Sequence, residues 1–207
     1  MQPTVAERRL TNRNPPFTRL FSYTKLTDID LVNRARSGDT HALEALVERH
    51  APRVNRLAAH LLGDLEEARD AAQESLVKLC TRLRQFRGDA QFGTWLHRLV
   101  VNTCRDRMAW QRVRHTEPLT LEDTANGDGG DGDPARLALL GDLRRDVADA
   151  LAKLSRDQRI AVVLRDSFGF SYEEIARVAR MPVGTAKCYV HRARNRLRAR
   201  LEEQATG

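Results

Sequence analysis

Apolar residues recur at alternating intervals of three and four positions between Leu65 and Phe86. The stripe consists of Leu65, Ala68, Ala72, Leu76, Leu79, Leu83 and Phe86. This spacing matches the period of an α-helix and predicts one helix of about six turns with a single buried side. No segment shows the convincing alternation of apolar and polar residues that marks a strand. The sequence therefore predicts an all-α fold.

Helical periodicity continues through most of the remaining chain. One helix is expected to begin near Asp39 or Thr40, and another covers residues 92–110. In the second half, Ser155 precedes Gln158 by three positions and Ser171 precedes Glu174 by three, so both serines are predicted to start helices as capping boxes. After Pro182, a longer helix with the apolar residues Val183, Ala186, Val190, Ala193, Leu197 and Leu201 is expected.

Charge divides the chain into two bodies. The net charge of the 207 residues is +7, but residues 117–141 contain six acidic residues and one basic residue. This connector is rich in Gly and Asp and poor in large apolar side chains, so it is predicted to be a flexible linker. We expect two small helical domains, at residues 28–116 and 142–203, with a basic and partly disordered arm at residues 1–27 and a short tail at residues 204–207.

Several classes of protein are disfavoured by composition. The longest strictly apolar run, Ile160–Leu164, is far shorter than the roughly 20 residues of a transmembrane helix, and residues 1–6 do not resemble a secretory signal. The three cysteines are widely spaced, as in proteins of a reducing compartment. The Asp-Gly run at residues 128–133 lacks the Gly and Glu of a calcium loop. We expect a cytoplasmic protein without membrane insertion, metal or cofactor.

The last two predicted helices form a helix-turn-helix pattern. The final helix has an apolar side and an opposite, basic side consisting of Lys187, His191, Arg194 and Arg198. In such motifs the N-terminal turns of the second helix present side chains to the bases of the major groove, and cations contact phosphates. Lys187, Cys188, His191 and Arg192 occupy those turns. The alternative is a solvated cationic face that closes an ordinary helical bundle.

Two regions of the sequence, each with two matching segments, resemble a known family. Residues 68–79 (ARDAAQESLVKL) and 86–102 (FRGDAQFGTWLHRLVVN) closely resemble region 2 of the extracytoplasmic-function (ECF) sigma factors of bacterial RNA polymerase. Residues 171–176 (SYEEIA) and 182–197 (PVGTAKCYVHRARNRL) resemble the region 4 helix-turn-helix of the same family. The two regions occur in the family's order with a linker between them, so the resemblance covers about residues 28–116 and 142–203.

The resemblance implies binding to core RNA polymerase through the first domain. In the family, an Asp-x-x-Gln-Glu helix docks on the clamp helices of the largest subunit, which suggests Asp70, Gln73 and Glu74 here. An acidic and amide patch beside a buried stripe is suited to basic groups of a partner. The alternative for these residues is an ordinary solvated helix face.

The resemblance also implies recognition and melting of the −10 promoter element. Base capture requires aromatic and cationic groups around a flipped base. Under this reading, the loop residues Phe86, Arg87, Gly88 and Asp89 shape the pocket, and Arg98, Asn102 and Arg105 contact bases or phosphates. Trp95 belongs either to the core or to the strand-separation surface, and Phe92 is expected in the core.

The second domain is implied to read the −35 element through Lys187, Cys188, His191, Arg192 and Arg194. Two positions depart from the family pattern. Arg180 stands where the turn usually has Gly, which affects the expected backbone geometry, and Cys188-Tyr189 replaces a common Ser-Arg, which affects the preferred promoter sequence. Cys188 is also a candidate for oxidation sensitivity.

The resemblance also has implications for the linker and for regulation. In the family, the connector runs through basic channels of the polymerase, and the acidic linker is electrostatically suited to such channels; the alternative is a passive tether. Members of the family are usually controlled by an anti-sigma factor.

Two other functions explain less of the sequence. A self-sufficient regulator would bind an operator as a dimer, but it leaves residues 70–74 and 86–102 without a role and lacks an apolar dimer seam. A helical nuclease would need clustered carboxylates for metal ions or a positioned His. Asp70 and Glu74 lie one helical turn apart without a second acidic pair. The sequence therefore favours a sigma factor that binds core RNA polymerase and promoter DNA and is not an enzyme.

Overall fold

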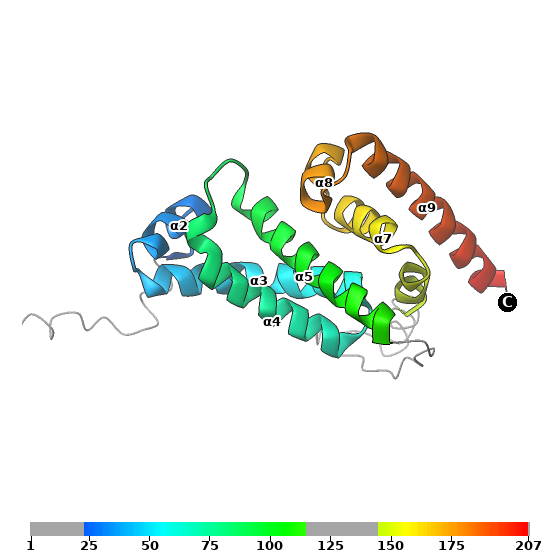
Figure 1. The fold of residues 1–207 in the computed structure, drawn as a ribbon, viewed down its shortest axis with the longest axis horizontal. Coiled ribbons are helices and arrows are strands. Elements are labelled where there is room, and N and C mark those ends of the chain that lie inside the picture. Colours follow the sequence, from blue (N-terminus) through cyan, green and yellow to red (C-terminus); the bar gives the residue numbers. More distant parts are fainter. Residues whose placement is uncertain (1–22, 115–144, 207) are drawn as a thin grey trace, which may run out of the picture. The chain divides into compact units, whose positions relative to one another are not determined.

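The computed structural model describes residues 23–114 and 145–206, and every regular element in these two ranges is helical (Figure 1). The prediction of an all-α fold is therefore confirmed for the described part of the chain. The linker at residues 117–141 and most of the N-terminal arm lie outside the described residues. In the same two ranges, no helix combines the length and hydrophobicity needed to cross a bilayer.

Backbone contacts divide the chain into a unit of residues 1–50 and a unit of residues 51–207. In the first unit, helix α2 (Asp28–Arg36) begins with a capping box formed by Thr27 and Asp30. The Asp28 carboxylate accepts hydrogen bonds from Arg49 Nη1 at 2.8 Å and contacts His50 Nε2 at 3.0 Å, which joins α2 to the first half of α3. Helix α3 (Thr40–Leu62) starts where the sequence predicted, because Asp39 Oδ1 accepts from the backbone N–H groups of His41 and Ala42.

Helices α4 (Leu65–Arg82) and α5 (Phe92–Arg114) pack against each other in the second unit. The sequence predicted a helix of about six turns from Leu65 to Phe86, and this length is wrong at its C-terminal end. The α-helix ends at Arg82, and a tighter 3₁₀ turn, η2 (Leu83–Gln85), follows it. Phe86 then adopts an extended backbone and directs its ring into the core, so the apolar stripe continues beyond the α-helix.

The core around these helices is formed by large aliphatic side chains without exposed surface. Leu57, Leu61, Leu79, Leu96, Val100 and Val101 are among the fully buried residues. The predicted stripe of α4 supplies Ala68, Ala72 and Leu79, which are buried, while Leu65 and Leu76 are half-buried. Burial of these side chains holds α5 at a fixed position relative to α4, and α5 bears several of the predicted DNA-binding residues.

The second half of the described chain contains α7 (Arg156–Val162), the π-helical turn η3 (Val163–Ser167), α8 (Tyr172–Ala179) and α9 (Val183–Thr206). Helix α9 packs on α7 and α8 through Ala186, Val190 and Ala193, all of which are buried. Ser171 forms the predicted capping box, because its hydroxyl accepts from Glu174 N and the Glu174 carboxylate accepts from Ser171 N.

The second predicted capping box, at Ser155, does not form. Ser155 occupies the N-cap position of α7 with an extended backbone, but its side chain makes no cap hydrogen bond. Gln158 cannot reach back to it, because the Gln158 side chain is buried and its Oε1 accepts from Arg196 Nη1 of α9 at 2.9 Å. Gln158 therefore contributes to the packing of α7 against α9 and does not cap the helix.

The turn between α8 and α9 retains a left-handed backbone although it lacks glycine. Arg180 has φ 51° and ψ 54° and ends α8, and its N–H donates to the Ala176 carbonyl. It is the only non-glycine residue with positive φ in the described ranges. The local geometry that the Gly-to-Arg departure made uncertain is thus a left-handed turn occupied by arginine.

Candidate polymerase and nucleic-acid interfaces

The exposed side of α4 bears the residues predicted to bind core polymerase, together with a cation that the sequence did not reveal. Arg107 of α5 lies beside three carboxylates of α4: its Nη1 contacts Glu67 Oε2 at 2.8 Å and Asp70 Oδ2 at 3.6 Å, and its Nη2 donates to Glu74 Oε2 at 3.3 Å. Burial by itself lowers the pKa of Arg107, but the hydrogen bonds that its guanidinium donates to Glu67 and Glu74 outweigh this effect, so the pKa of Arg107 is raised.

The three predicted residues on α4 have different surroundings. Asp70 is 67% exposed and Gln73 is also exposed, so both side chains are accessible to a partner. Glu74 is bound within the molecule, because Lys78 Nζ lies 2.7 Å from its Oε1 and Arg107 contacts its other oxygen. The hydrogen bond from Lys78, more than that from Arg107, lowers the pKa of Glu74. Glu74 therefore organises this face, and Asp70 and Gln73 project from it.

An aromatic cluster holds the two ends of the predicted −10 loop. The centroid of the Phe86 ring lies 5.5 Å from the ring centroids of both Phe92 and Trp95, and the centroids of the Phe92 and Trp95 rings are 5.7 Å apart. Phe86 and Phe92 are almost completely buried, whereas Trp95 is half-buried. Phe92 is thus in the core as expected, and Trp95 borders both core and surface. Phe86 lies inside the cluster, while Arg87, Gly88 and Asp89 are exposed, with Gly88 at φ 84°.

The predicted −10 residues of α5 are not all accessible. Arg98 is exposed, and Asn102 is half-buried. Arg105 turns away from solvent: its Nη2 donates to Asp157 Oδ1 of α7 at 3.1 Å and to the Ala179 carbonyl at the end of α8 at 3.0 Å. α5 packs against α8, so the described arrangement occupies Arg105 with protein partners.

A cavity of about 310 Å³ joins these α5 residues to cations that sequence reasoning missed. It is lined by Lys78, Arg82, Leu99, Asn102, Arg105, Asp106 and Arg180. Lys78 and Arg82 belong to α4 and are four residues apart, so they lie on one side of that helix. This four-residue spacing could have indicated a basic side of α4 from the sequence alone. The sequence did not indicate, however, that this side of α4 lies beside Asn102. Lys78 Nζ also donates to Thr103 Oγ1 at 2.8 Å.

The basic side of α9 is exposed for most of the predicted −35 residues. Lys187, His191 and Arg192 are exposed, and Cys188 is half-buried. Lys187 also lies over the Tyr172 ring, with Nζ 5.7 Å from the ring centroid. Arg194 differs, since its guanidinium binds Asp166 with both Nε and Nη2, the Nε–Oδ2 distance being 3.0 Å. This hydrogen bond raises the pKa of Arg194 and ties α9 to η3.

None of the three thiols forms a disulfide, and their surroundings differ. Cys104 is completely buried, and desolvation raises its pKa to about 12, so its thiolate is unavailable at neutral pH. Cys80 is exposed on α4, and Cys188 is half-buried on α9. In the described ranges, no group of three or more His, Cys, Asp or Glu side chains has the geometry of a metal site.

Comparisons with known proteins match both halves of the chain. The family model described as Sigma-70 region 2 matches residues 46–114, and that described as Sigma-70, region 4 matches residues 144–197. The RNA polymerase sigma-H factor of Pseudomonas aeruginosa is 34% identical over 177 residues, which cover 83% of this chain and 92% of that protein. The ECF RNA polymerase sigma-E factor of Haemophilus influenzae is 35% identical over 86% of this chain and 97% of its own length.

Solved structures give the same result for the fold. The sigma factor RpoE, crystallised with the anti-sigma factor NepR from Bartonella quintana, matches with a TM-score of 0.62 and 29% identity, over 75% of this chain and 94% of that one. CnrH in complex with the cytosolic domain of CnrY also matches with a TM-score of 0.62, at 28% identity, over 85% of this chain and 97% of CnrH.

Proposed function

Since this chain belongs to the ECF family of RNA polymerase sigma factors, we propose that it is a cytoplasmic, non-enzymatic subunit that directs core RNA polymerase to promoters. The observation that carries this proposal is the presence of both regions in the family's order, each folded into helices. Residues 28–116 form the region 2 domain and residues 142–203 the region 4 domain, joined by the acidic linker at 117–141 and flanked by the arm at 1–27 and the tail at 204–207.

Core binding uses the exposed side of α4. Asp70 and Gln73 contact the clamp helices of the largest polymerase subunit, and Glu74 acts with them. Two features support this assignment: the high exposure of Asp70 and Gln73, and the fixed position of Glu74 between Lys78 and Arg107. Because Arg107 is shared by three carboxylates, it holds this acidic face in shape while leaving it net negative.

Promoter recognition uses two separate surfaces. Arg87, Gly88 and Asp89, carried by the loop that Phe86 anchors, surround a flipped base of the −10 element, and Arg98, Asn102 and Arg105 contact the same strand. Lys187, Cys188, His191, Arg192 and Arg194 of α9 read the −35 element. Arg105 contacts DNA only after it leaves Asp157 and Ala179, so promoter binding requires α5 to separate from α7 and α8.

Control by an anti-sigma factor follows from the same arrangement. One of the similar solved structures is a sigma factor bound to an anti-sigma factor. A partner that stabilises the contact of α5 with α8 would keep Arg105 away from DNA, and a partner that covers Asp70 and Gln73 would block core binding.

Run-off transcription with purified bacterial core polymerase and a promoter library tests the proposal. We expect core-dependent transcripts that share a two-element promoter motif. The double variant with Asp70→Asn and Gln73→Ala should reduce transcript yield by about tenfold or more, because two exposed contacts with the polymerase are lost. This pair is a sharper test than one that includes Glu74, whose replacement would also remove two intramolecular ion pairs.

Glu66→Gln is the matched control, since Glu66 is an exposed carboxylate in the first turn of the same helix. Its transcript yield should equal that of the unmodified protein. Full activity of the Asp70/Gln73 double variant would refute the assignment of the core-binding residues. A protein that shifts a specific duplex by itself but gives no transcripts with core polymerase would refute the sigma-factor mechanism.

A further inference from the structure

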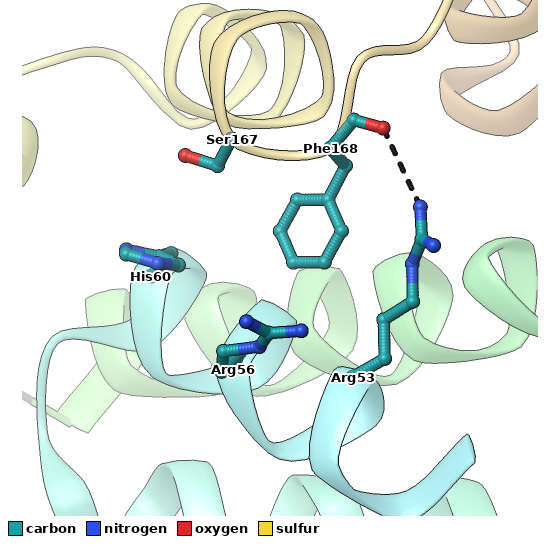
Figure 2. A pocket seen from close by; sticks show the side chains of 5 residues that line it. All are labelled: Arg53, Arg56, His60, Ser167 and Phe168. Atoms are coloured by element: carbon teal, nitrogen blue, oxygen red, sulfur yellow. Dashed lines mark hydrogen bonds between the residues drawn. The ribbon is translucent and has the colours of Figure 1, made fainter. Parts of the chain in front are cut away.

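A basic pocket lies outside the surfaces assigned to polymerase and promoter. It has a volume of about 250 Å³ and is lined by Arg53, Arg56 and His60 of α3 and by Ser167 and Phe168 of the η3 turn. Figure 2 shows the Phe168 ring pointing toward α3, with Arg53 on one side and His60 on the other. Both sides of the pocket belong to the compact unit of residues 51–207.

Arg53 and Arg56 of this pocket differ from four arginines elsewhere in the described ranges that lie beside carboxylates. Arg49, Arg105, Arg107 and Arg194 each have a carboxylate within ion-pair distance. In the described ranges, no carboxylate forms an ion pair with Arg53, Arg56 or His60, and none lines the pocket. The pocket is therefore a concentration of positive charge that nothing in the described chain neutralises.

The two arginines of the pocket differ in how the protein holds them. Arg53 Nε donates to His97 Nε2 at 3.1 Å, its Nη2 donates to the Phe168 carbonyl at 3.4 Å, and its guanidinium lies 5.4 Å from the Phe168 ring centroid. His97 is buried, and its ring packs on Phe168 and Phe170. Arg53 thus has a fixed orientation, while Arg56 has no protein hydrogen bond among the described residues and is available to a ligand.

We propose that this pocket binds the terminal phosphate group of a small molecule. Arg53 and Arg56 line the pocket from α3 and Ser167 lines it from η3, so a group with several acceptor oxygens, such as a phosphate, can be contacted from both elements. The volume exceeds the roughly 30 Å³ share of one water molecule several times and accommodates a phosphate with part of its hydration. Burial and, after it, the nearby Arg56 charge lower the pKa of His60, so the positive charge of the pocket comes from Arg53 and Arg56.

A phosphate in this pocket would bridge α3 and η3. These two elements come from the region 2 and region 4 segments, and they already share the hydrogen bond from Arg53 to Phe168. The ligand would therefore stabilise the packing that keeps Arg105 on Asp157 and Ala179. The phosphate-binding site itself does not depend on the assignment of promoter contacts.

Isothermal titration calorimetry of the full chain with inorganic phosphate and with pyrophosphate, at constant ionic strength, tests the proposal. We expect one saturable site and a rise in Tm with ligand concentration. Arg56→Gln should weaken binding by about tenfold or more, as expected for a lost charge-assisted hydrogen bond. Ser167→Ala should weaken it by about threefold, because a neutral donor is lost from the opposite wall.

Arg69→Gln is the matched control, since Arg69 is an exposed helical arginine of α4 for which no ion pair is formed in the described ranges, and the variant loses the same charge. Its affinity for phosphate should be unchanged. Equal weakening by Arg56→Gln and Arg69→Gln, or the absence of saturable binding, would overturn the proposal. So would unchanged binding by Ser167→Ala, because the site would then involve α3 alone.

A competition arm separates a small phosphate ligand from the DNA backbone. A mixed-sequence duplex is added to the phosphate-loaded protein, and we expect phosphate to remain bound. Displacement of phosphate by the duplex, combined with weaker duplex binding by Arg56→Gln, would identify the pocket as a DNA contact and overturn the small-molecule assignment. Failure of transcription by this protein would leave the calorimetric result unaffected, so the two proposals fail independently.

Discussion

At the scale of single residues, Arg180 holds a backbone conformation that glycine adopts with less strain. An ordinary residue in the left-handed region is destabilised by about 1–2 kcal/mol, whereas glycine there loses about 0.5–1 kcal/mol through its greater freedom in the unfolded chain. Arg180 also lines the cavity with Asn102 and Arg105, and its exposed side chain adds a cation there. The arginine at position 180 thus combines a strained backbone with a positive charge beside Asn102 and Arg105, two of the predicted −10 residues.

We predict that Arg180→Gly raises the free energy of unfolding by about 0.5–1 kcal/mol, because it relieves the left-handed strain. Urea denaturation followed by circular dichroism measures the change. Arg180→Ala is the control, since it removes the same side chain but keeps the strain, and it should not stabilise the protein. Equal stabilisation by both variants would attribute the effect to the side chain and refute the backbone explanation.

At the scale of helices, similar sequence spacings produced different structures. Ser171 and Glu174 form a complete capping box, whereas Ser155 and Gln158 have the same spacing but no side-chain cap. The difference arises from α9, whose Arg196 binds the buried Gln158 side chain. A local pattern is decisive only where no tertiary contact competes for the same side chain.

We predict that Ser171→Ala lowers the free energy of unfolding by about 1 kcal/mol, the usual effect of losing an N-cap. Ser155→Ala should change it by less than about 0.5 kcal/mol, because no cap hydrogen bond is lost. Both variants are compared in the same urea titration. If the two substitutions were equally destabilising, the assignment of only one capping box would be wrong.

The same distinction explains how much of the fold the sequence could predict. The apolar period located α3, α4, α5, α8 and α9 and their buried sides, because burial of one stripe is a local property of each helix. It placed the end of α4 too late, since a 3₁₀ turn keeps the same residues buried without continuing the α-helix. It did not predict the π-helical turn η3, whose geometry depends on contacts with other helices.

At the scale of the whole molecule, the site depends on contacts between distant segments that no motif encodes. Sequence patterns predicted three binding surfaces: the exposed side of α4, the loop at residues 86–89 and the basic side of α9. They did not reveal that Arg107 binds the α4 carboxylates from 33 to 40 residues away, or that Arg105 binds Asp157 52 residues away. Such pairs follow from three-dimensional packing, and a single sequence contains no record of them.

We predict that Asp157→Asn increases the affinity of the free protein for single-stranded −10 DNA by about threefold to tenfold, because it weakens the hold on Arg105. Fluorescence anisotropy with a labelled oligonucleotide measures the change. Asp106→Asn is the control. Asp106 follows Arg105 in α5, is exposed and lines the cavity, and its substitution also removes one negative charge near Arg105. An equal gain in both variants would indicate a general charge effect and contradict the release of Arg105.

The aromatic cluster of Phe86, Phe92 and Trp95 has a thermodynamic consequence for the proposed base capture. Phe86 and Phe92 are buried at the two ends of residues 87–91, of which all but Ala90 are exposed, so both ends of this short loop are held by the core. A loop anchored in this way has little conformational entropy left to lose when it closes around a base. More of the binding free energy then remains available to offset the unstacking of that base from the duplex.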